Sequence, residues 1–470
     1  MNVKSFIKKA LILLFILNLS PVFGQEFRRG AVLDLNRYNQ VDVRPALLAR
    51  NYTSLPRSAS LKQNSPYAGD QGDYGTCVGW ATAYAARTIS ESLAFNRTDR
   101  QQTSENVFSP IYVYKRIAND PTGQRGSYIS DALNLMKNQG IVKQLPAEKT
   151  MSFRNISISM FQDAQRYPIS GYVRLFSVRR GVAGTIAERV LPVKKSLSEG
   201  KPVIIGMNTP DSFFKAKDLW QPTESSGRDH GGHAMCVVGY DDDKYGGAFE
   251  VQNSWGDRWG NGGFTWITYR DFVSFVDEAY EIIENLAIYK DAVQYAASIE
   301  IQVFNSADGM PVTFDRQGFY KTRSSYPSGT DFRFLMTNRH PAYVYAFSAD
   351  STTPGTERIF PLRGVSPVMD YIDSTVAWPG EFTWIRLNET VGTDYLVVLF
   401  SKEELDIDAI QRRFASERGA FPDRVARAVG QNFIPYNTVE YNASSMSFSA
   451  SSNNPRAVFA LLLAIDHRAR

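Results

Sequence analysis

The pattern of the chain changes near residue 290, and this change most constrains the fold. Before it, segments with apolar residues at helical spacing come first and strand-like runs follow, which favours an α+β fold. After it, short β-type runs are separated by Gly, Pro, Asn and Ser, which favours a β-sandwich or a partly open barrel. The expected helices cover 77 to about 93 and 129–139, and the expected strands cover 202–207, 233–240, 249–253, 298–305, 332–336, 342–348, 382–387, 395–400, 439–449 and 458–466.

The length of 470 residues indicates more than one domain. Residues 1–24 carry three lysines, an apolar run and small residues at Val22 and Gly24, the pattern of a cleavable signal peptide. We therefore expect an exported protein, periplasmic or extracellular, with a short polar lead at 25–54, a first domain at 55–290 and a β-rich accessory domain at 298–470.

Charge and composition exclude several classes of function. The chain has 52 Lys and Arg against 48 Asp and Glu, and loss of Lys4, Lys8 and Lys9 with the signal peptide leaves 49 against 48. This balance gives no reason to expect nucleic acid or anionic lipid as a partner. No later apolar stretch is long enough for a membrane span. Two Cys and four His provide no ligand set for zinc, so we expect neither a metal nor a cofactor.

Cys77 is the candidate nucleophile. It follows Gly75-Thr76 at the start of the expected helix, where backbone amides and the helix dipole stabilise a thiolate. Gln71 lies six residues earlier in a glycine-flanked turn and could direct its amide towards an oxyanion. The pair supplies two of the parts that cysteine catalysis needs.

The remaining parts lie on two later strands. His233 begins an apolar strand that continues to Tyr240, so a rigid element would hold the imidazole. Asn253 ends another strand and precedes Trp255; its amide could orient the imidazole while the indole shields the pair from water. Cys77, His233, Asn253 and Gln71 are therefore the candidate catalytic residues.

Three segments together resemble the papain family of cysteine peptidases: Gln71-Gly72-Asp73-Tyr74-Gly75-Thr76-Cys77, the histidine segment 231–241 and the asparagine segment 253–264. The resemblance covers about 55–290 and implies a two-lobed fold that hydrolyses peptide bonds in a peptide or protein substrate. It further implies that Gly126-Ser127 binds the substrate backbone beside the scissile bond and that Trp255 walls the leaving-group side of the cleft.

The sequence departs from the family pattern at several positions. Val78 replaces the aromatic residue that usually follows the nucleophile, Tyr74 replaces a disulfide-forming Cys, and Gly232 replaces an acidic residue before the histidine. The lead before Leu55 also lacks the periodicity of a long helical inhibitory pro-segment. None of these changes affects the four candidate catalytic residues.

Other residues have simpler interpretations. Cys236 lies three positions from His233 on a strand and should face the opposite side, in the core. His230 competes as a base, but its glycine-rich loop indicates a solvated residue, and His340 and His467 are expected on the surface. Ser401 to Glu404 has the spacing of a capping box that would open a helix in the accessory domain.

Two alternatives to peptide hydrolysis remain open. The first is a catalytically inactive fold that binds peptides or a cell-surface partner through the accessory domain, which resembles β-rich domains of unknown function appended to bacterial peptidases. The second keeps the same site but performs acyl transfer or hydrolyses cell-wall peptides.

Overall fold

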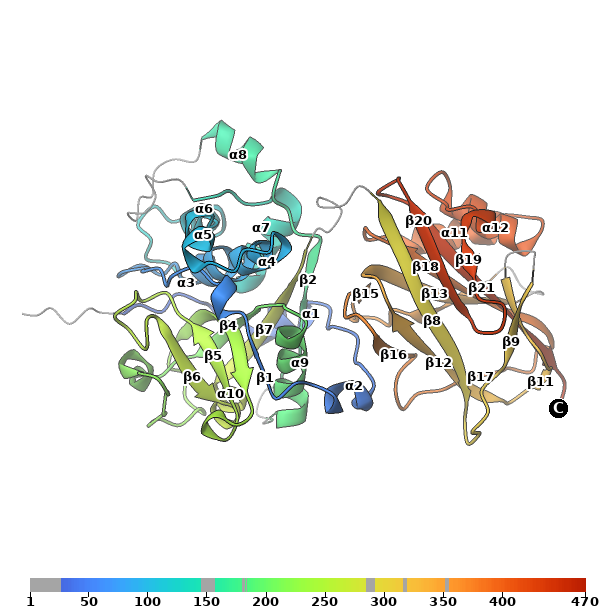
Figure 1. Cartoon of the computed structure of the whole chain (residues 1–470), viewed down its shortest axis with the longest axis horizontal. Coiled ribbons are helices and arrows are strands. Elements are labelled where there is room, and N and C mark those ends of the chain that lie inside the picture. Colours follow the sequence, from blue (N-terminus) through green and yellow to red (C-terminus); the bar gives the residue numbers. More distant parts are fainter. Residues whose placement is uncertain are drawn as a thin grey trace, which may run out of the picture.

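The computed structural model describes residues 27–144, 157–179, 182, 184–284, 292–315, 319–350 and 355–470. The predicted signal peptide at 1–24 lies outside these residues. The structure has two modules side by side, an N-terminal module (27–284) and a C-terminal module (292–470) (Figure 1).

The N-terminal module packs helices against one antiparallel sheet. The strands lie in the order β2-β7-β3-β4-β5-β6, and β1 pairs with β4. Its helices are α1 (Leu35–Gln40), α2 (Ala49–Thr53), α3 (Cys77–Gly79), α4 (Thr88–Ala94), α5 (Arg100–Glu105), α6 (Pro110–Ala118), α7 (Ile129–Gln139), α8 (Ile158–Ala164), α9 (Ile186–Ser198) and α10 (Tyr269–Phe275). Its strands are β1 (Ser58–Ser60), β2 (Gly171–Arg174), β3 (Val203–Asn208), β4 (Gly232–Asp241), β5 (Ala248–Gln252), β6 (Phe264–Thr268) and β7 (Val276–Ile283).

The helix predicted to begin at Cys77 is continuous to Ala94, because a π-helical stretch, Trp80–Arg87, joins α3 to α4. The buried residues of the π-helical stretch are four alanines together with Trp80, Thr82 and Arg87, and the stretch packs against β4 and β3. The helix α7 begins at Ile129 and ends at Gly140 as predicted, and Gly140 has the positive φ of 73° that glycine tolerates.

The central strand β4 is buried along almost its whole length. Its antiparallel neighbours are β3 and β5, with Cys236 opposite Ile204 on one side and Gln252 on the other. Cys236 is fully buried in the core, as predicted. This pairing places the start of β4 beside the end of β5, where the two predicted strand residues of the site lie.

The C-terminal module is a sandwich of two sheets. One sheet has the order β14-β13-β18-β21-β10-β9 with β11 and β15 at its margins, and the other has the order β16-β12-β8-β20-β19 with β17. The elements are β8 (Val293–Val303), β9 (Val312–Asp315), β10 (Phe319–Thr322), β11 (Tyr326–Pro327), β12 (Asp331–Asn338), β13 (Ala342–Asp350), β14 (Thr356–Phe360), β15 (Val368–Met369), β16 (Ser374–Trp378), β17 (Ile385–Arg386), β18 (Gly392–Ser401), α11 (Ile407–Ser416), α12 (Phe421–Val429), β19 (Glu440–Tyr441), β20 (Ser447–Ser452) and β21 (Val458–Arg468).

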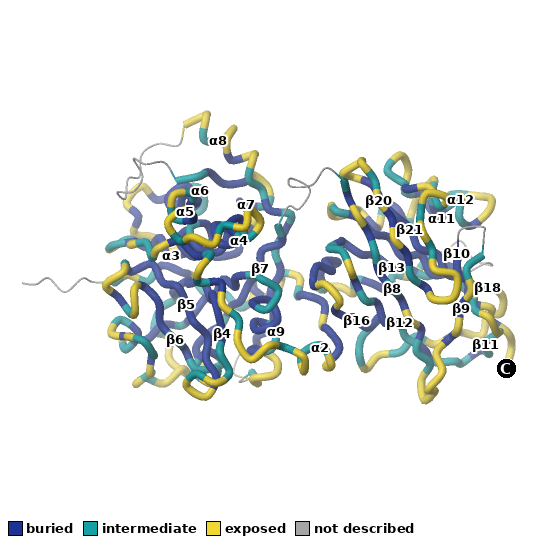
Figure 2. The backbone as a smooth tube through the Cα atoms, viewed as in Figure 1, coloured by how far each residue is buried: buried dark blue, intermediate teal, exposed yellow. Residues whose placement is uncertain are grey.

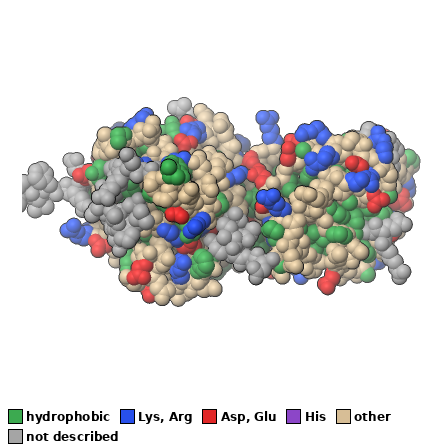
Figure 3. Space-filling model, turned by 90° about the horizontal axis from the view of Figure 1, so that it is seen from above, with side chains coloured by type: hydrophobic (Ala, Val, Ile, Leu, Met, Phe, Trp, Pro, Cys, Tyr) green, Lys and Arg blue, Asp and Glu red, His purple; other side chains and the backbone are tan. Residues whose placement is uncertain are grey.

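Each module has its own buried core (Figure 2). A further apolar cluster packs α11 and α12 on the outer face of the sandwich and also includes Val173 and Ile283 of the N-terminal module. Apolar packing therefore continues across the contact between the modules. On the face shown in Figure 3, basic and acidic side chains occur on both modules, in keeping with the near balance of charge in the sequence.

Four predictions for the C-terminal module were wrong. The single strand predicted at 439–449 is two strands, Glu440–Tyr441 and Ser447–Ser452, and residues 442–446 lie outside both. Ser401 ends β18, and α11 instead begins after Asp406, whose carboxylate accepts the Ala409 amide at 2.9 Å. His467 is buried, because Asp394 and Ser328 bind its two ring nitrogens. The strand predicted at 382–387 is only the pair Ile385–Arg386.

In the part of the chain that the structure describes, no helix has both the length and the apolar character that crossing a membrane requires.

Candidate active site

Cys77 is fully buried at the first position of α3, which packs against β4. The thiol lies beside the backbone of Ala234, the residue that follows His233, and beside that of Gly30. Helix α3 therefore brings the candidate nucleophile to the start of the strand that carries the candidate base, as the sequence predicts.

His233 and Asn253 are in direct contact. The imidazole Nε2 lies 2.7 Å from Asn253 Oδ1. The Ser254 amide donates to the same oxygen at 2.8 Å, which fixes the orientation of the Asn253 amide. Because Oδ1 can only accept, Nε2 carries the proton and Nδ1 is left as the basic nitrogen. Nδ1 has no hydrogen-bond partner among the described residues.

Gln71 is held by Ser254, the residue that follows Asn253. Its Oε1 accepts a hydrogen bond from Ser254 Oγ at 2.7 Å, and its backbone amide donates to the Ser254 carbonyl at 2.8 Å. These contacts direct Nε2 away from Ser254, and it donates to the carbonyls of Tyr74 (2.7 Å) and Arg28 (2.9 Å). Gln71 is thus a fixed donor for a carbonyl oxygen that enters the cleft.

Trp255 forms an aromatic wall over the histidine. Its ring stacks on His233 with centroids 4.5 Å apart and an interplanar angle of 24°. Trp259 and Phe213 meet the ring of Trp255 in T-shaped contacts, with ring centroids 5.4 and 5.8 Å away. The packed indole restricts access of water to His233 and limits rotation of the imidazole.

The first residues of the described part of the lead, which begins at Phe27, occupy this cleft. Phe27 stacks on Trp255 with a centroid distance of 5.0 Å, and the Arg28 carbonyl accepts hydrogen bonds from Gln71 Nε2 and from Trp255 Nε1 at 3.2 Å. Arg29 pairs with Asp211 and lies over the ring of Phe214. The sequence does not predict this contact, because backbone atoms of the lead make most of it.

The predicted substrate-binding residues Gly126 and Ser127 also contact the lead. Ser127 donates its amide to the Gly30 carbonyl and accepts from the Val32 amide, both at 2.9 Å, and the Ala31 amide donates to the Gly232 carbonyl at 3.0 Å. A Cβ at Gly232 would lie 2.3 Å from the Ala31 carbonyl oxygen. The glycine that departs from the family pattern is therefore the residue that leaves space for the lead.

Burial keeps both reactive groups neutral. It raises the pKa of the Cys77 thiol to about 12, although neighbouring backbone amides act in the opposite direction. It lowers the pKa of His233 to about 4, and Arg29 of the lead acts in the same direction while the bond to Asn253 opposes it. With the lead in place, the site holds a thiol and a neutral imidazole rather than a thiolate–imidazolium pair.

Other features of the site are absent from the sequence predictions. Glu278 of β7 accepts the Asp34 amide at 3.0 Å where the lead leaves the cleft, and burial raises its pKa to about 7. Ser254 positions Gln71 as described above. His230 contributes nothing to the site, because its Nε2 lies 2.8 Å from the Ser225 carbonyl in the outer loop. Among the described residues, no group of three or more His, Cys, Asp or Glu side chains could hold a metal ion.

Comparison with known proteins gives one family for this part of the chain. The model described as papain family cysteine protease matches residues 56–279. An uncharacterised peptidase C1-like protein of Acanthamoeba polyphaga mimivirus is 26% identical over 213 residues, covering 43% of this chain and 64% of that protein. A cysteine protease of Blomia tropicalis is 25% identical over 242 residues, covering 49% and 66%. The chain thus spans slightly less than two thirds of these relatives.

Solved structures of cysteine proteases also match this part of the chain. Xylellain, a cysteine protease from Xylella fastidiosa, is 21% identical with a TM-score of 0.42, and the match covers 55% of this chain and 96% of xylellain. The digestive procathepsin L2 proteinase of the Tenebrio molitor larval midgut is 20% identical with a TM-score of 0.42, covering 56% and 81%.

Proposed function

Residues 56–279 belong to the papain family of cysteine proteases, and from this premise we propose that the protein is an exported cysteine peptidase that cleaves peptide bonds within peptides or proteins. The observation that supports the reaction most directly is the His233–Asn253 contact, which leaves Nδ1 of a buried imidazole as the base beside the helix start at Cys77. A cysteine nucleophile needs such an oriented base.

The proposed reaction has two halves. Cys77 transfers its proton to His233 Nδ1 and attacks the substrate carbonyl carbon. Gln71 Nε2 and the Cys77 backbone N–H stabilise the oxyanion that forms. The imidazolium then gives the proton to the leaving amine as the C–N bond breaks. A water molecule, deprotonated by His233, hydrolyses the thioester and regenerates Cys77.

In this proposal the described form of the chain is inhibited. The Arg28 carbonyl occupies the Gln71 donor, and Gly30 to Val32 occupy the backbone groups of Ser127 and Gly232 that a substrate would use. The raised pKa of Cys77 and the lowered pKa of His233 oppose proton transfer while the lead covers them. Activity therefore requires residues 27–34 to leave the cleft.

Export rests on the sequence pattern of residues 1–24. N-terminal sequencing of protein recovered from the periplasm or medium tests it, with Gln25 expected as the first residue. Recovery of the uncleaved chain in the cytoplasm would contradict export and leave the catalytic proposal unaffected.

The test of catalysis needs an open cleft. A Cβ at Gly30 would lie 2.3 Å from the backbone oxygen of Gly75, so Gly30→Val should displace the lead without changing a catalytic side chain. We expect the Gly30→Val protein to cleave members of a peptide library under reducing conditions and the Gly30→Val/Cys77→Ala protein to cleave none. Gly30→Val/Cys236→Ala is the matched control, because it removes the thiol on the other face of the strand, and it should stay active.

The library also separates the alternatives. Products shortened by hydrolysis within the peptide support an endopeptidase, and mass spectrometry would identify acyl transfer by products joined to an added amine. A folded Gly30→Val protein that binds peptides but cleaves none, with Cys77 unmodified by an epoxysuccinyl peptide, would overturn the peptidase proposal.

A further inference from the structure

The lead does not end its contacts at the cleft. After α1, where Tyr38 is fully buried and its hydroxyl donates to the Ala279 carbonyl at 3.3 Å, the lead runs between the two modules. The Arg44 amide donates to the Arg174 carbonyl of the N-terminal module at 3.0 Å. Val43 faces the other way: its amide donates to the Gly364 carbonyl and its carbonyl accepts from the Ser366 amide, both at 2.9 Å. The lead is therefore a connecting strand between the modules.

A buried group of charges holds the lead at this point. The guanidinium of Arg44 pairs with Glu281 of the N-terminal module and with Asp370 of the C-terminal module. Lys201 pairs with the same two carboxylates, at 3.2 Å from Glu281. Tyr371 donates its hydroxyl to Glu281 at 2.6 Å. The positive charges of Arg44 and Lys201 thus neutralise the two carboxylates only while the lead and both modules are in place.

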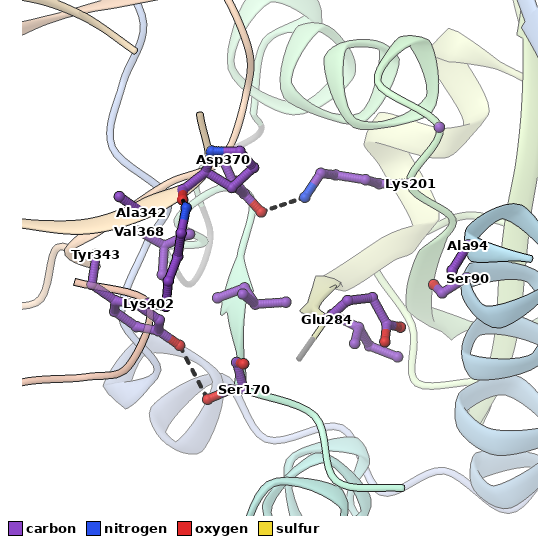
Figure 4. Close-up of a pocket in the computed structure, with 14 residues that line it drawn as sticks. Ser90, Ala94, Ser170, Lys201, Glu284, Ala342, Tyr343, Val368, Asp370 and Lys402 are labelled. Carbon is purple, nitrogen blue, oxygen red and sulfur yellow. Dashed lines mark hydrogen bonds and ion pairs between the residues drawn. The ribbon is translucent and has the colours of Figure 1, made fainter. Parts of the chain in front are cut away.

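Figure 4 shows the cavity beside this group of charges, which has a volume of about 270 Å³ and is lined by residues of both modules, among them Lys201 and Asp370. The Asp370–Lys201 ion pair spans the two modules at one side of the cavity. At another side, the Tyr343 hydroxyl donates to the Ser170 carbonyl at 3.1 Å. The Asp370–Lys201 and Tyr343–Ser170 contacts therefore join the two modules beside the lead.

The next residues of the lead lie on the C-terminal module itself. Leu47 is buried in the core of the sandwich and bridges Val376 of β16. The Leu48 amide donates to the Thr375 carbonyl at 3.0 Å, and its side chain packs with Leu335 and Ala377 in a small cluster. Figure 1 places α2, which follows directly, between the modules near β16. The C-terminal module therefore holds residues 43–48 by apolar burial, hydrogen bonds and charge.

We propose that the C-terminal module is the anchor of the inhibitory lead: by binding residues 43–48 it keeps residues 27–34 in the cleft. A segment tethered at one end returns to its site at a high effective concentration, so a few backbone hydrogen bonds suffice to fill the cleft. Displacement of the module would leave Arg44 and Lys201 facing Glu281 alone and remove the cover of Leu47. Undocking of the C-terminal module would thus free residues 43–48 and weaken the hold on the lead, which Arg37 and Tyr38 still bind to the N-terminal module. The further step, that a weaker hold on the lead raises peptidase activity, rests on the proposed function.

The test uses the full chain with catalysis-independent measurements. Asp370→Asn removes a charge of the anchor, and Leu48→Ala removes apolar contact in a cluster separate from the main cores. We expect each to increase hydrogen exchange at Ala31 and Val32 at least tenfold and to increase the alkylation rate of Cys77 by iodoacetamide by a similar factor. Asp394→Asn is the matched control, since Asp394 of β18 binds His467 of β21, and it should change neither the exchange rate nor the alkylation rate.

The wild-type protein provides a second measurement should a variant fail to fold. The amides of Ala31 and Val32 and those of Val43 and Leu48 should exchange with one common opening rate, because the anchor and the cleft segment release together. Exchange in the cleft that is much faster than at 43–48, or folded variants with unchanged exchange and alkylation, would overturn the anchor. Neither readout needs turnover, so a failed anchor and a failed peptidase proposal give different results.

Discussion

At the scale of single residues, the burial of Cys77 and His233 opposes the proton transfer that the proposed reaction needs. His233 has its protonated nitrogen fixed by Asn253 and its basic nitrogen unengaged, yet burial lowers its pKa and raises that of Cys77. Solvent or a polar substrate in place of the lead would restore hydration to both groups and move both pKa values back. In the proposed function, the same side chains therefore serve an inhibited form and an active form.

Gln71→Ala tests the oxyanion donor. In the Gly30→Val background we expect kcat to fall about 10²- to 10³-fold with little change in KM, because the lost hydrogen bond forms chiefly in the transition state. Steady-state kinetics on one cleaved peptide measure it. Gln124→Ala is the control, since that amide binds Asp73 at the exposed mouth of the cleft. A loss confined to KM would assign Gln71 to substrate binding alone.

Glu278→Gln tests the buried carboxyl beneath the lead. Burial raises the pKa of Glu278 from its usual value near 4.5 to about 7, so between these pH values the folded protein holds a proton that the unfolded chain releases. The contribution of the protonated carboxyl is complete below pH 4.5 and lost as pH rises to 7. The stability difference between wild type and Glu278→Gln should therefore shift by about 3 kcal/mol in favour of wild type from pH 7.5 to pH 4.5.

Urea unfolding of both proteins in a Cys77→Ala background measures this difference. The titration of His233 occurs in both proteins and cancels from the comparison. A difference that does not vary with pH would show that Glu278 is ionised in the folded protein.

At the scale of elements, close backbone approach decides how the lead lies against the catalytic helix. Gly30 lies against Gly75, just before α3, and Gly232 at the start of β4 lies against Ala31. Backbone hydrogen bonds to Ser127 and Gly232 then fix the lead in place. Contacts of this kind require small residues on both partners.

Gly30→Val should expose Cys77. A valine side chain at this position meets backbone, which cannot rotate away, so the lead must move. We expect alkylation of Cys77 by iodoacetamide at pH 8 to be at least tenfold faster than in wild type, where the pKa of about 12 keeps the thiol protonated. Mass spectrometry of the modified peptide checks it. Gly227→Val adds the same side chain in an open loop and should leave the rate unchanged; equal rates in all three proteins would contradict the displacement.

At the scale of the whole molecule, the lead joins two modules that have separate cores. Apolar packing and the buried charges at Arg44 and Lys201 connect them. Because a buried ion pair depends on each of its partners, this contact is either fully formed or strongly weakened. If the C-terminal module anchors the lead as we propose, the covering of the cleft depends on both modules and not on the N-terminal module alone.

Arg44→Met tests the energetic weight of this contact. Removal of the guanidinium leaves two buried carboxylates with Lys201 as the remaining paired cation, and we expect a loss of about 3–5 kcal/mol in the free energy of unfolding. Urea unfolding in the Cys77→Ala background measures it. Arg57→Met is the control, because its ion pair with Asp243 is largely exposed, and it should change stability little. Equally small stability losses for Arg44→Met and Arg57→Met would mean that water reaches the charges around Arg44.

The sequence by itself determined the local parts of the site. The start of the helix at Cys77, the strand that carries His233 and the strand that ends before Asn253 follow from glycine turns and apolar runs within a few residues. The contact of His233 with Asn253 and the position of Gln71 were predictable because three ordered motifs resembled one family. The start of α11 was not predictable from the sequence, because Ser401 and Asp406 both offer a capping side chain. The strand β18 extends to Ser401, which leaves Asp406 as the cap.

Only the tertiary structure decided that the lead fills the cleft and that the C-terminal module holds it. These contacts join Arg28 to Gln71, Ala31 to Gly232 and Arg44 to Asp370, which are 43 to 326 positions apart in the chain. Backbone hydrogen bonds leave no side-chain pattern, and a buried charge finds its partner only when separate elements pack together. For that reason local sequence motifs predict the candidate catalytic residues, whereas the proposed inhibition by the lead depends on contacts that form only in the folded chain.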